Sequence, residues 1–310
     1  MSANTKIIAV GGDQLTGKTM LGTHLSVALR APHVSAGQYF RAIAAQRGMG
    51  VGEFSKSIRL SGESDQIDVR IEYETCRTII SGLVNNSAPL MPWKAPPGTP
   101  NVVIEGRNPA VMAAYCRTLG VNNSVCVYLK CDPRVQALRF VGREVDRDLR
   151  VSFDALIPRD VEFKSILHVT DTLGSILERD NTALRRAVAA LTEFHGEEWA
   201  ARVRVQEWTL APLLNAVTAL RETAMRDEDD RRRFLELYEL PESMDYRSET
   251  LYDVVVNTTL HKAGQLTQPL QEIALRQDDT RDFVLGFLAG NETGRGLLRD
   301  AQLALRAEHA

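Results

Sequence analysis

The fold is decided by the stretch KIIAVGGDQLTGKT, residues 6–19. It opens with a short run rich in β-branched side chains that ends at two glycines, which is typical of a buried strand entering a turn. From residue 18 to residue 30, apolar residues recur at helical spacing. A strand, a glycine-rich loop and a helix in this order predict a loop whose backbone N–H groups surround a phosphate chain at a helix N-terminus.

Within this loop, Gly12, Gly17, Lys18 and Thr19 match the G-x-x-x-x-G-K-[ST] pattern of nucleotide-binding loops. In such a loop the lysine reaches the β- and γ-phosphates of ATP, and the hydroxyl beside it holds Mg²⁺. We therefore expect ATP and Mg²⁺ as cofactors. The residues expected to bind ATP are those of the whole pattern: Gly12, Asp13, Gln14, Leu15, Thr16, Gly17, Lys18 and Thr19.

Two residues of the loop are unusual. Leu15 stands where a small residue is common, although the pattern accepts any residue whose backbone angles fit. Asp13 places a carboxylate beside a polyphosphate, which repels it unless a metal ion or an arginine screens the charge. We interpret Asp13 as a turn residue, and two other roles stay open for it: a base, or a group that binds water on Mg²⁺.

Composition excludes several classes of protein. A net charge of −3 over 310 residues lacks the basic excess needed to coat nucleic acid, so no nucleic-acid partner is expected. There is no basic N-terminal region with a long apolar run and no stretch of 18 apolar residues, so we expect no membrane partner and a cytoplasmic protein. The four cysteines form no C-x-x-C pair, which predicts reduced thiols and no zinc site.

The rest of the chain extends the first strand into a sheet. Compact apolar runs at 101–106, 124–129 and 252–258 are typical of strands, and helical sequence separates the first two. Two helices precede these runs and are expected to stop at Gly48 and Gly82. Strands that alternate with helices predict an α/β protein with a parallel sheet covered on both faces, as in the three-layer P-loop NTPase fold.

A long helical block interrupts this pattern. Between residues 132 and 238 there is almost no strand signal, and breaks are expected at Pro158, Gly174, Gly196 and Pro212. We predict four parts: a P-loop core with acceptor-binding helices and a proline-rich surface loop at 89–100 (1–147), a helical insert or enlarged lid (148–220), a lid arginine helix with the last core strand (221–262), and C-terminal helices (263–310).

Two charged segments could serve phosphate chemistry. Glu105 ends a predicted strand that should lie beside the loop, where a carboxylate can hold magnesium-bound water, so Thr19 and Glu105 form the predicted metal site. Arg107 follows close to the same edge. The run RDEDDRRRF, residues 226–234, is by itself typical of a solvated helix face with i,i+4 ion pairs, but its arginines could also screen phosphates that approach each other.

Several segments resemble, in the same order, the archaeal-type cytidylate kinases, a branch of the P-loop nucleoside monophosphate kinases. The resemblance is carried by HVSAGQYFRAIAAQRGMGVGEFSK (33–56), DQIDVRIE (65–72), NVVIEGR (101–107), VYLKCDPRVQALRFVGRE (127–144), RDEDDRRRFLELYEL (226–240) and LYDVVVNTT (251–259). It implies an ATP-dependent phosphotransferase that converts a nucleoside monophosphate into the diphosphate.

The resemblance also implies roles for individual residues. Arg41, on the helix after Ser35 and Gly37, would grip the monophosphate together with Arg107. The lid pattern R-D-x-x-D-x-x-R of the bacterial branch is met by the run that begins at Arg226. The implied catalytic residues are Lys18, Arg139, Arg143, Arg226 and Arg233, and the implied acceptor-binding residues are Ser35, Gly37, Arg41, Arg107 and Asp230.

The acceptor itself stays open. Asp65 and Asp68 lie in the matching acceptor stretch without an assigned contact. P-loop kinases of small molecules commonly place an aspartate after the second strand, and HVSAGQYF (33–40) has no acid there. A monophosphate is already ionised and needs no base, so this absence favours CMP, dCMP or UMP.

Two alternatives remain. One is a kinase of another small molecule, an alcohol, with Asp13 as the base. The other is a non-catalytic nucleotide-binding protein whose helical insert binds a partner through Trp199 or Trp208. The sequence predicts no oligomeric state.

Overall fold

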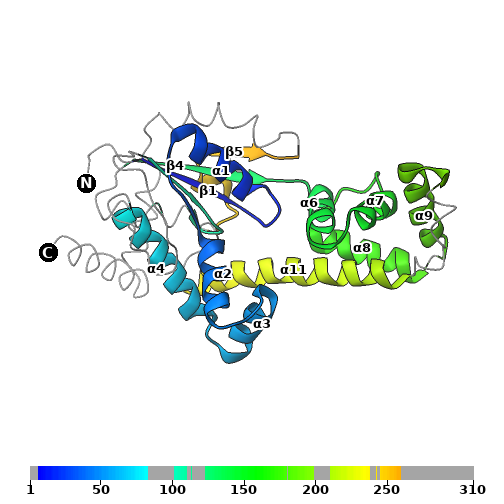
Figure 1. The fold of residues 1–310 in the computed structure, drawn as a ribbon, viewed down its shortest axis with the longest axis horizontal. Helices are drawn as coiled ribbons and strands as arrows, with labels where there is room; N and C mark the ends of the chain where they lie inside the picture. Colours follow the sequence, from blue (N-terminus) through cyan, green and yellow to red (C-terminus); the bar gives the residue numbers. More distant parts are fainter. Residues whose placement is uncertain are drawn as a thin grey trace. The chain divides into compact units, whose positions relative to one another are not determined.

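A computed structural model describes residues 6–82, 101–109, 113, 123–179, 181–198, 210–237, 242 and 245–259. Its helices and strands are labelled in Figure 1. The predicted proline-rich loop at 89–100, the predicted C-terminal helices at 263–310, Trp199 and Trp208 lie outside the described residues. No helix within the described ranges is long and apolar enough to cross a membrane.

A five-stranded sheet forms the centre of the fold, with the strand order β2-β3-β1-β4-β5. All its neighbouring strands are parallel, as predicted. The strand His33–Ser35 was not predicted, because three residues are too few to show a periodicity. The strands are β1 (Lys6–Gly12), β2 (His33–Ser35), β3 (Asn101–Glu105), β4 (Asn123–Lys130) and β5 (Val254–Asn257).

Four helices connect the first three strands. They are α1 (Lys18–Leu29), α2 (Ala36–Gln46), α3 (Val51–Ser61) and α4 (Ser64–Gly82). The first predicted stop is confirmed, because Gly48 follows α2 with a left-handed φ of 68°. Gly82 is the last described residue of α4, so the stop predicted there stays a prediction.

Side chains alternate between the two faces of the sheet, and a hydrophobic core lies on each face. On one face, Ile7 of β1 belongs to a cluster with Tyr39 of α2 and Phe54 of α3. On the other face, Ile8 belongs to a cluster with Leu21 of α1. The sheet is therefore covered on both sides, which confirms the predicted three-layer α/β fold.

The chain forms two compact units. Of the described residues, those at 6–13, 17–130 and 231–259 belong to the sheet unit, and those at 14–16 and 131–230 belong to the helical unit. The helical unit contains α6 (Pro133–Phe140), the π-helix η1 (Val141–Val145), α7 (Arg147–Leu156), α8 (Ile166–Arg179), α9 (Asn181–His195) and most of α11 (Leu210–Leu237). A separate insert limited to 148–220 stays a prediction.

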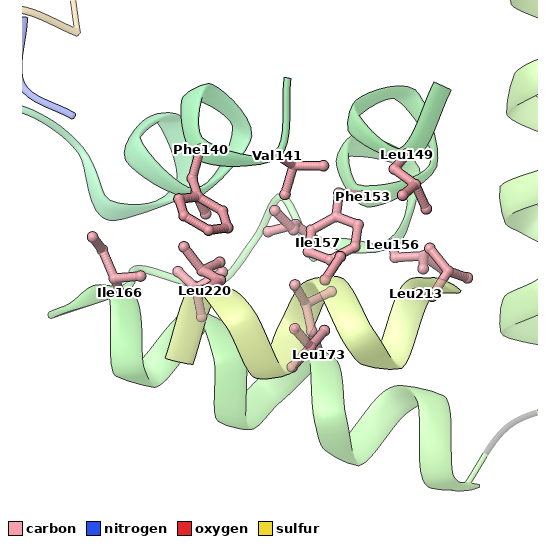
Figure 2. Close-up of a cluster of buried hydrophobic side chains, with 14 of the residues drawn as sticks. Phe140, Val141, Leu149, Phe153, Leu156, Ile157, Ile166, Leu173, Leu213 and Leu220 are labelled. Carbon is pink, nitrogen blue, oxygen red and sulfur yellow. The ribbon is translucent and has the colours of Figure 1, made fainter. Parts of the chain in front are cut away.

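The helical unit has its own apolar core. Figure 2 shows side chains from α6, α7, α8 and α11 that point toward one another, with Phe153 among them. Phe153, Leu173, Leu213 and Leu220 are fully buried. Burial of a side chain of this size stabilises a fold by about 1.5–3 kcal/mol, so this core contributes substantially to the stability of the helical unit.

One predicted break in the helical block is wrong. Gly174 lies inside α8, between the buried residues Leu173 and Leu177, because the packing of the helix outweighs the cost of about 1 kcal/mol for an interior glycine. Two other breaks are confirmed: Pro158 follows the end of α7 at Leu156, and Gly196 follows α9 with a φ of 86°. Pro212 lies inside α11, and the residues before Leu210 lie outside the described ranges, so the break at Pro212 stays a prediction.

Candidate active site

The predicted phosphate loop connects β1 to α1. Gly12 has a φ of 141° and Gly17 a φ of 98°, both in the region that side chains rarely adopt. Gly17 is also the N-cap of α1, so the loop leads directly into the first turn of that helix, whose N–H groups have no partner within the helix. This conformation explains both glycines of the pattern.

Leu15 combines a left-handed backbone conformation with a buried side chain. Its φ of 66° is left-handed, which costs a leucine on the order of 1–2 kcal/mol. Its side chain is buried and belongs to the core of the helical unit, which offsets that cost. Two side chains of α6 hold the same tip: Gln136 Nε2 donates to Gln14 O at 2.9 Å, and Arg139 Nη1 donates to Leu15 O at 3.0 Å.

Lys18 folds back over the loop that precedes it. Its Nζ donates to the carbonyl oxygens of Gly12 at 2.8 Å and of Asp13 at 2.5 Å. The ammonium charge is therefore held beside the loop's N–H groups. A polyphosphate bound by those groups would meet Lys18 without a large movement of its side chain.

Thr19 and Glu105 meet at the ends of α1 and β3. The Thr19 hydroxyl donates to Glu105 Oε1 at 2.9 Å, and Glu105 is buried with an exposed fraction of 5%. Glu105 Oε2 is buried and has no hydrogen-bond partner among the described residues. Proteins bind Mg²⁺ or its waters through oxygen ligands such as hydroxyl and carboxylate groups. Thr19 and Glu105 supply one of each, so the predicted metal site suits Mg²⁺.

The described residues contain no group of three histidine, cysteine or acidic side chains that could hold a metal ion by themselves. Magnesium differs from zinc in this respect, because it keeps several waters and takes further ligands from substrate phosphates. Two side chains are therefore enough for the site.

Sequence reasoning missed His33, which lies beside Glu105. Its Nε2 is buried and 3.8 Å from Glu105 Oε1. Burial lowers the pKa of His33, and the Glu105 carboxylate acts against that shift by raising it. A β-carbon on Gly22 of α1 would lie 2.4 Å from His33 Nε2, so the glycine makes room for the ring. In the sequence, Gly22 was the one residue that could have indicated a close neighbour of α1, and a glycine does not by itself show that this neighbour is a histidine.

Asp13 is engaged by the segment that precedes β5. Its Oδ1 accepts a hydrogen bond from Arg247 Nε at 2.8 Å and another from the Tyr246 hydroxyl at 3.2 Å. Tyr252 donates in turn to the Tyr246 carbonyl at 2.7 Å. An arginine therefore screens the Asp13 charge, as a carboxylate beside a phosphate loop requires.

The predicted residues around α2 lie together. Ser35 ends β2 and is the N-cap of α2, which contains Gly37 and Arg41. A β-carbon on Gly37 would be 3.5 Å from Arg41 Nη1 and 3.6 Å from Ser35 Oγ, so the arginine side chain lies over the glycine. Arg41 is exposed, which suits a group that binds a substrate phosphate.

Arg233 meets the acids of α4. Its Nη2 donates to Asp68 Oδ2, and its Nε lies 3.3 Å from Asp65 Oδ1. Burial raises the pKa of Asp68, and this effect is larger than the opposite effect of the Arg233 and Arg107 charges, which lower it. Two predicted arginines from distant segments therefore act on one carboxylate.

The remaining predicted residues belong to the helical unit. Arg226 and Asp230 lie half-buried on α11, and Arg143 of η1 is exposed and paired with Glu144, with 2.5 Å between Nε and Oε1. Arg233 follows Asp230 on the same helix but belongs to the sheet unit.

A phosphate loop at the end of β1, in a parallel sheet with an acid at the end of the neighbouring strand, defines a P-loop NTPase-type α/β protein. No protein-family model matches the chain. A cytidylate kinase from Pyrobaculum calidifontis is 31% identical over 163 residues, which is 52% of this chain and 70% of that protein. A cytidylate kinase from Methanococcus aeolicus is 27% identical over 154 residues, 50% of this chain and 72% of that protein.

A third relative, a cytidylate kinase from Pyrobaculum arsenaticum, is 28% identical over 139 residues, 44% of this chain and 60% of that protein. The chain belongs to the cytidylate kinase family, and it is therefore a phosphotransferase. About half of the chain takes part in these matches.

Proposed function

We propose that this protein transfers the γ-phosphoryl group of ATP to a nucleoside monophosphate, CMP or dCMP first and UMP next, to give the diphosphate. The observation that carries the proposal is the hydrogen bond from the exposed Thr19 to the buried Glu105, beside a loop with the backbone conformation of a phosphate-binding loop. The similarity to enzymes named cytidylate kinase supports the pyrimidine acceptor.

On the donor side, the N–H groups of residues 12–19 and the ammonium of Lys18 would hold the phosphates of ATP. Thr19 and Glu105 would hold Mg²⁺ or its waters. When it is bound, Mg²⁺ neutralises part of the charge on the phosphate oxygens. His33 lies beside Glu105, and burial lowers the pKa of its imidazole.

On the acceptor side, Arg41, Arg107 and Arg233 would bind the monophosphate and screen its charge from that of ATP. An oxygen of the monophosphate then forms a bond to the γ-phosphorus while the bond from that phosphorus to the β,γ-bridging oxygen breaks, and ADP leaves. The attacking oxygen is already ionised, so no proton has to be removed.

The alternative of an alcohol acceptor requires a base, and Asp13 is the candidate from the sequence. Its Oδ1 already accepts bonds from Arg247 and Tyr246, which makes it a poor acceptor for a substrate proton. This arrangement favours a positioning role for Asp13 and a phosphate as the acceptor.

The test is ATP consumption by the purified full chain with CMP, dCMP, UMP, AMP, GMP and a panel of alcohols. We expect consumption with CMP or dCMP above all other acceptors, and cytidine diphosphate as the product. Consumption with an alcohol and with no nucleotide would overturn the proposal. An Asp13→Asn variant distinguishes a monophosphate acceptor from an alcohol acceptor. The variant should still phosphorylate CMP, because a monophosphate supplies its own ionised oxygen and needs no base.

A further inference from the structure

We infer that Asp68 is a positioning residue of the acceptor site, which holds the Arg233 guanidinium in place for the monophosphate and so sets the affinity for the acceptor. The inference rests on the proposed function. Asp68 belongs to α4, in the acceptor stretch for which the sequence assigned no contact.

The contacts of Arg233 are unequal. Its Nη2 donates to Asp68, whose side chain has an exposed fraction of 13%. Its Nε lies 3.3 Å from Asp65, whose side chain is 55% exposed. The two acids are three residues apart and share one face of α4. Water screens the outer pair and hardly reaches the inner one, so Asp68 is the acid that fixes the guanidinium.

The aromatic ring of Phe234 adds a second restraint. The Arg233 guanidinium carbon lies 5.9 Å from the centre of that ring, and Phe234 is itself buried in the core of the sheet unit. The guanidinium is therefore held by a carboxylate and by a ring that cannot move freely. Such a group is organised before its ligand arrives, which reduces the entropy cost of binding.

Arg107 acts on Asp68 from a different part of the chain. It follows β3, and its charge lowers the pKa of Asp68 in the same direction as that of Arg233. Two guanidinium groups in one region repel each other. A carboxylate that attracts both of them lowers the electrostatic free energy of this arrangement before a phosphate is bound. Asp68 thus allows two predicted acceptor arginines to share one region of the sheet unit.

A purely stabilising role explains these observations less well. Burial raises the pKa of Asp68, so the fold bears a cost for keeping a carboxylate there. A carboxylate that the fold keeps despite its burial, next to arginines with a proposed ligand, indicates a role in binding.

The experiment compares wild type with Asp68→Asn, which keeps the shape and removes the charge. At pH 8 we expect the KM for CMP to rise about tenfold in Asp68→Asn, with the KM for ATP and kcat nearly unchanged. Asp65→Asn is the matched control, because it removes the exposed acid beside the same guanidinium, and its KM for CMP should change less than twofold. Asp68→Glu, which restores the charge, should recover part of the loss.

The outcomes separate the inference from the proposed function. An unchanged KM for CMP in Asp68→Asn, with an active wild type, overturns the role of Asp68 and leaves the kinase assignment standing. A lower KM for CMP also overturns it, because that result would mean that Asp68 competes with the phosphate for Arg233. A wild type that phosphorylates no monophosphate overturns both. If Asp68→Asn is poorly folded by thermal melting, Asp68→Glu decides instead: its longer side chain should displace the Arg233 guanidinium and raise the KM for CMP above that of wild type, and an unchanged KM for CMP overturns the role of Asp68.

Discussion

The two units of the molecule bury different kinds of side chain. Among its described residues, the sheet unit buries the carboxylates of Glu72, Glu74, Glu105 and Asp245. The described helical unit buries one, that of Asp227, and its core consists of aliphatic and aromatic residues. Burial of a carboxylate is costly, so its frequency in one unit indicates where binding and chemistry are concentrated.

The tip of the phosphate loop is an exception to this division. Gln14, Leu15 and Thr16 belong to the helical unit, with Leu15 in its apolar core. The rest of the loop belongs to the sheet unit. We therefore expect the chemistry to depend mainly on polar groups of the sheet unit, and the stability of the helical unit to depend mainly on its apolar core. Four substitutions test it.

The largest effect is expected for Lys18→Ala in the sheet unit. Loss of the ammonium that lies over the loop should lower kcat by about 10³-fold or more, because the charge on the transferred group is no longer balanced. The measurement is ATP turnover with CMP, accompanied by a thermal melt that should match wild type. Lys56→Ala, an exposed lysine of the same unit, is the control. Turnover retained within tenfold would contradict the assignment of the loop.

A substitution in the helical unit should show the opposite profile. Phe153→Ala removes a fully buried ring and should lower the free energy of unfolding by about 3–5 kcal/mol, measured by urea denaturation. The KM for CMP of the folded fraction should stay within about twofold, because the ring belongs to the apolar core of the helical unit, while Arg41, Arg107 and Arg233 belong to the sheet unit. Phe194→Ala, at a half-exposed ring of α9, is the control and should cost little. A large rise in KM for CMP would break the division between the units.

Glu105→Gln tests the metal pair of the sheet unit. The substitution keeps a hydrogen-bond acceptor for Thr19 and removes the negative charge that favours Mg²⁺. We expect the Mg²⁺ concentration for half-maximal activity to rise by about 10- to 100-fold, measured as a titration at saturating ATP. Glu53→Gln, at an exposed position of α3, should not shift that titration. An unchanged Mg²⁺ requirement would remove Glu105 from the metal site.

The local parts of this arrangement could be predicted from the sequence. The strand, loop and helix around Gly12 and Lys18 follow one another in the chain, so their pattern alone indicates the loop. Glu105 could be placed near Thr19 because neighbouring parallel strands end at the same edge of a sheet, and the structure has this contact. Both inferences use periodicity and chain order, which a sequence displays directly.

The contacts that could not be predicted join residues far apart in the chain. Arg233 pairs with Asp68 across 165 positions and Arg247 with Asp13 across 234, and no periodicity connects such pairs. The burial of Leu15 was missed for another reason: a leucine in a loop looks like a tolerated variation unless the core that receives it is known. Tertiary packing decided all three.

The smallest effect is expected in the pH dependence of stability, and it is specific to the sheet unit. Burial raises the pKa of Asp68 above its usual value near 3.8, against the charges of Arg233 and Arg107, while Asp65 adds to the rise. The folded protein therefore holds a proton at Asp68 that the unfolded chain has already lost, so this group stabilises the fold at low pH and the contribution is lost as pH rises through the folded pKa.

The amide of the Asp68→Asn variant does not titrate, so only wild type loses this contribution. As pH rises from 3.8, the unfolding free energy of wild type should therefore fall relative to that of Asp68→Asn, and the difference should become constant above the folded pKa. Urea denaturation at a series of pH values measures it. Asp171→Asn, at an exposed acid of the helical unit, is the control and should show no comparable trend. A difference that moves the other way would mean that the two guanidiniums outweigh burial at Asp68 and lower its pKa below the usual value.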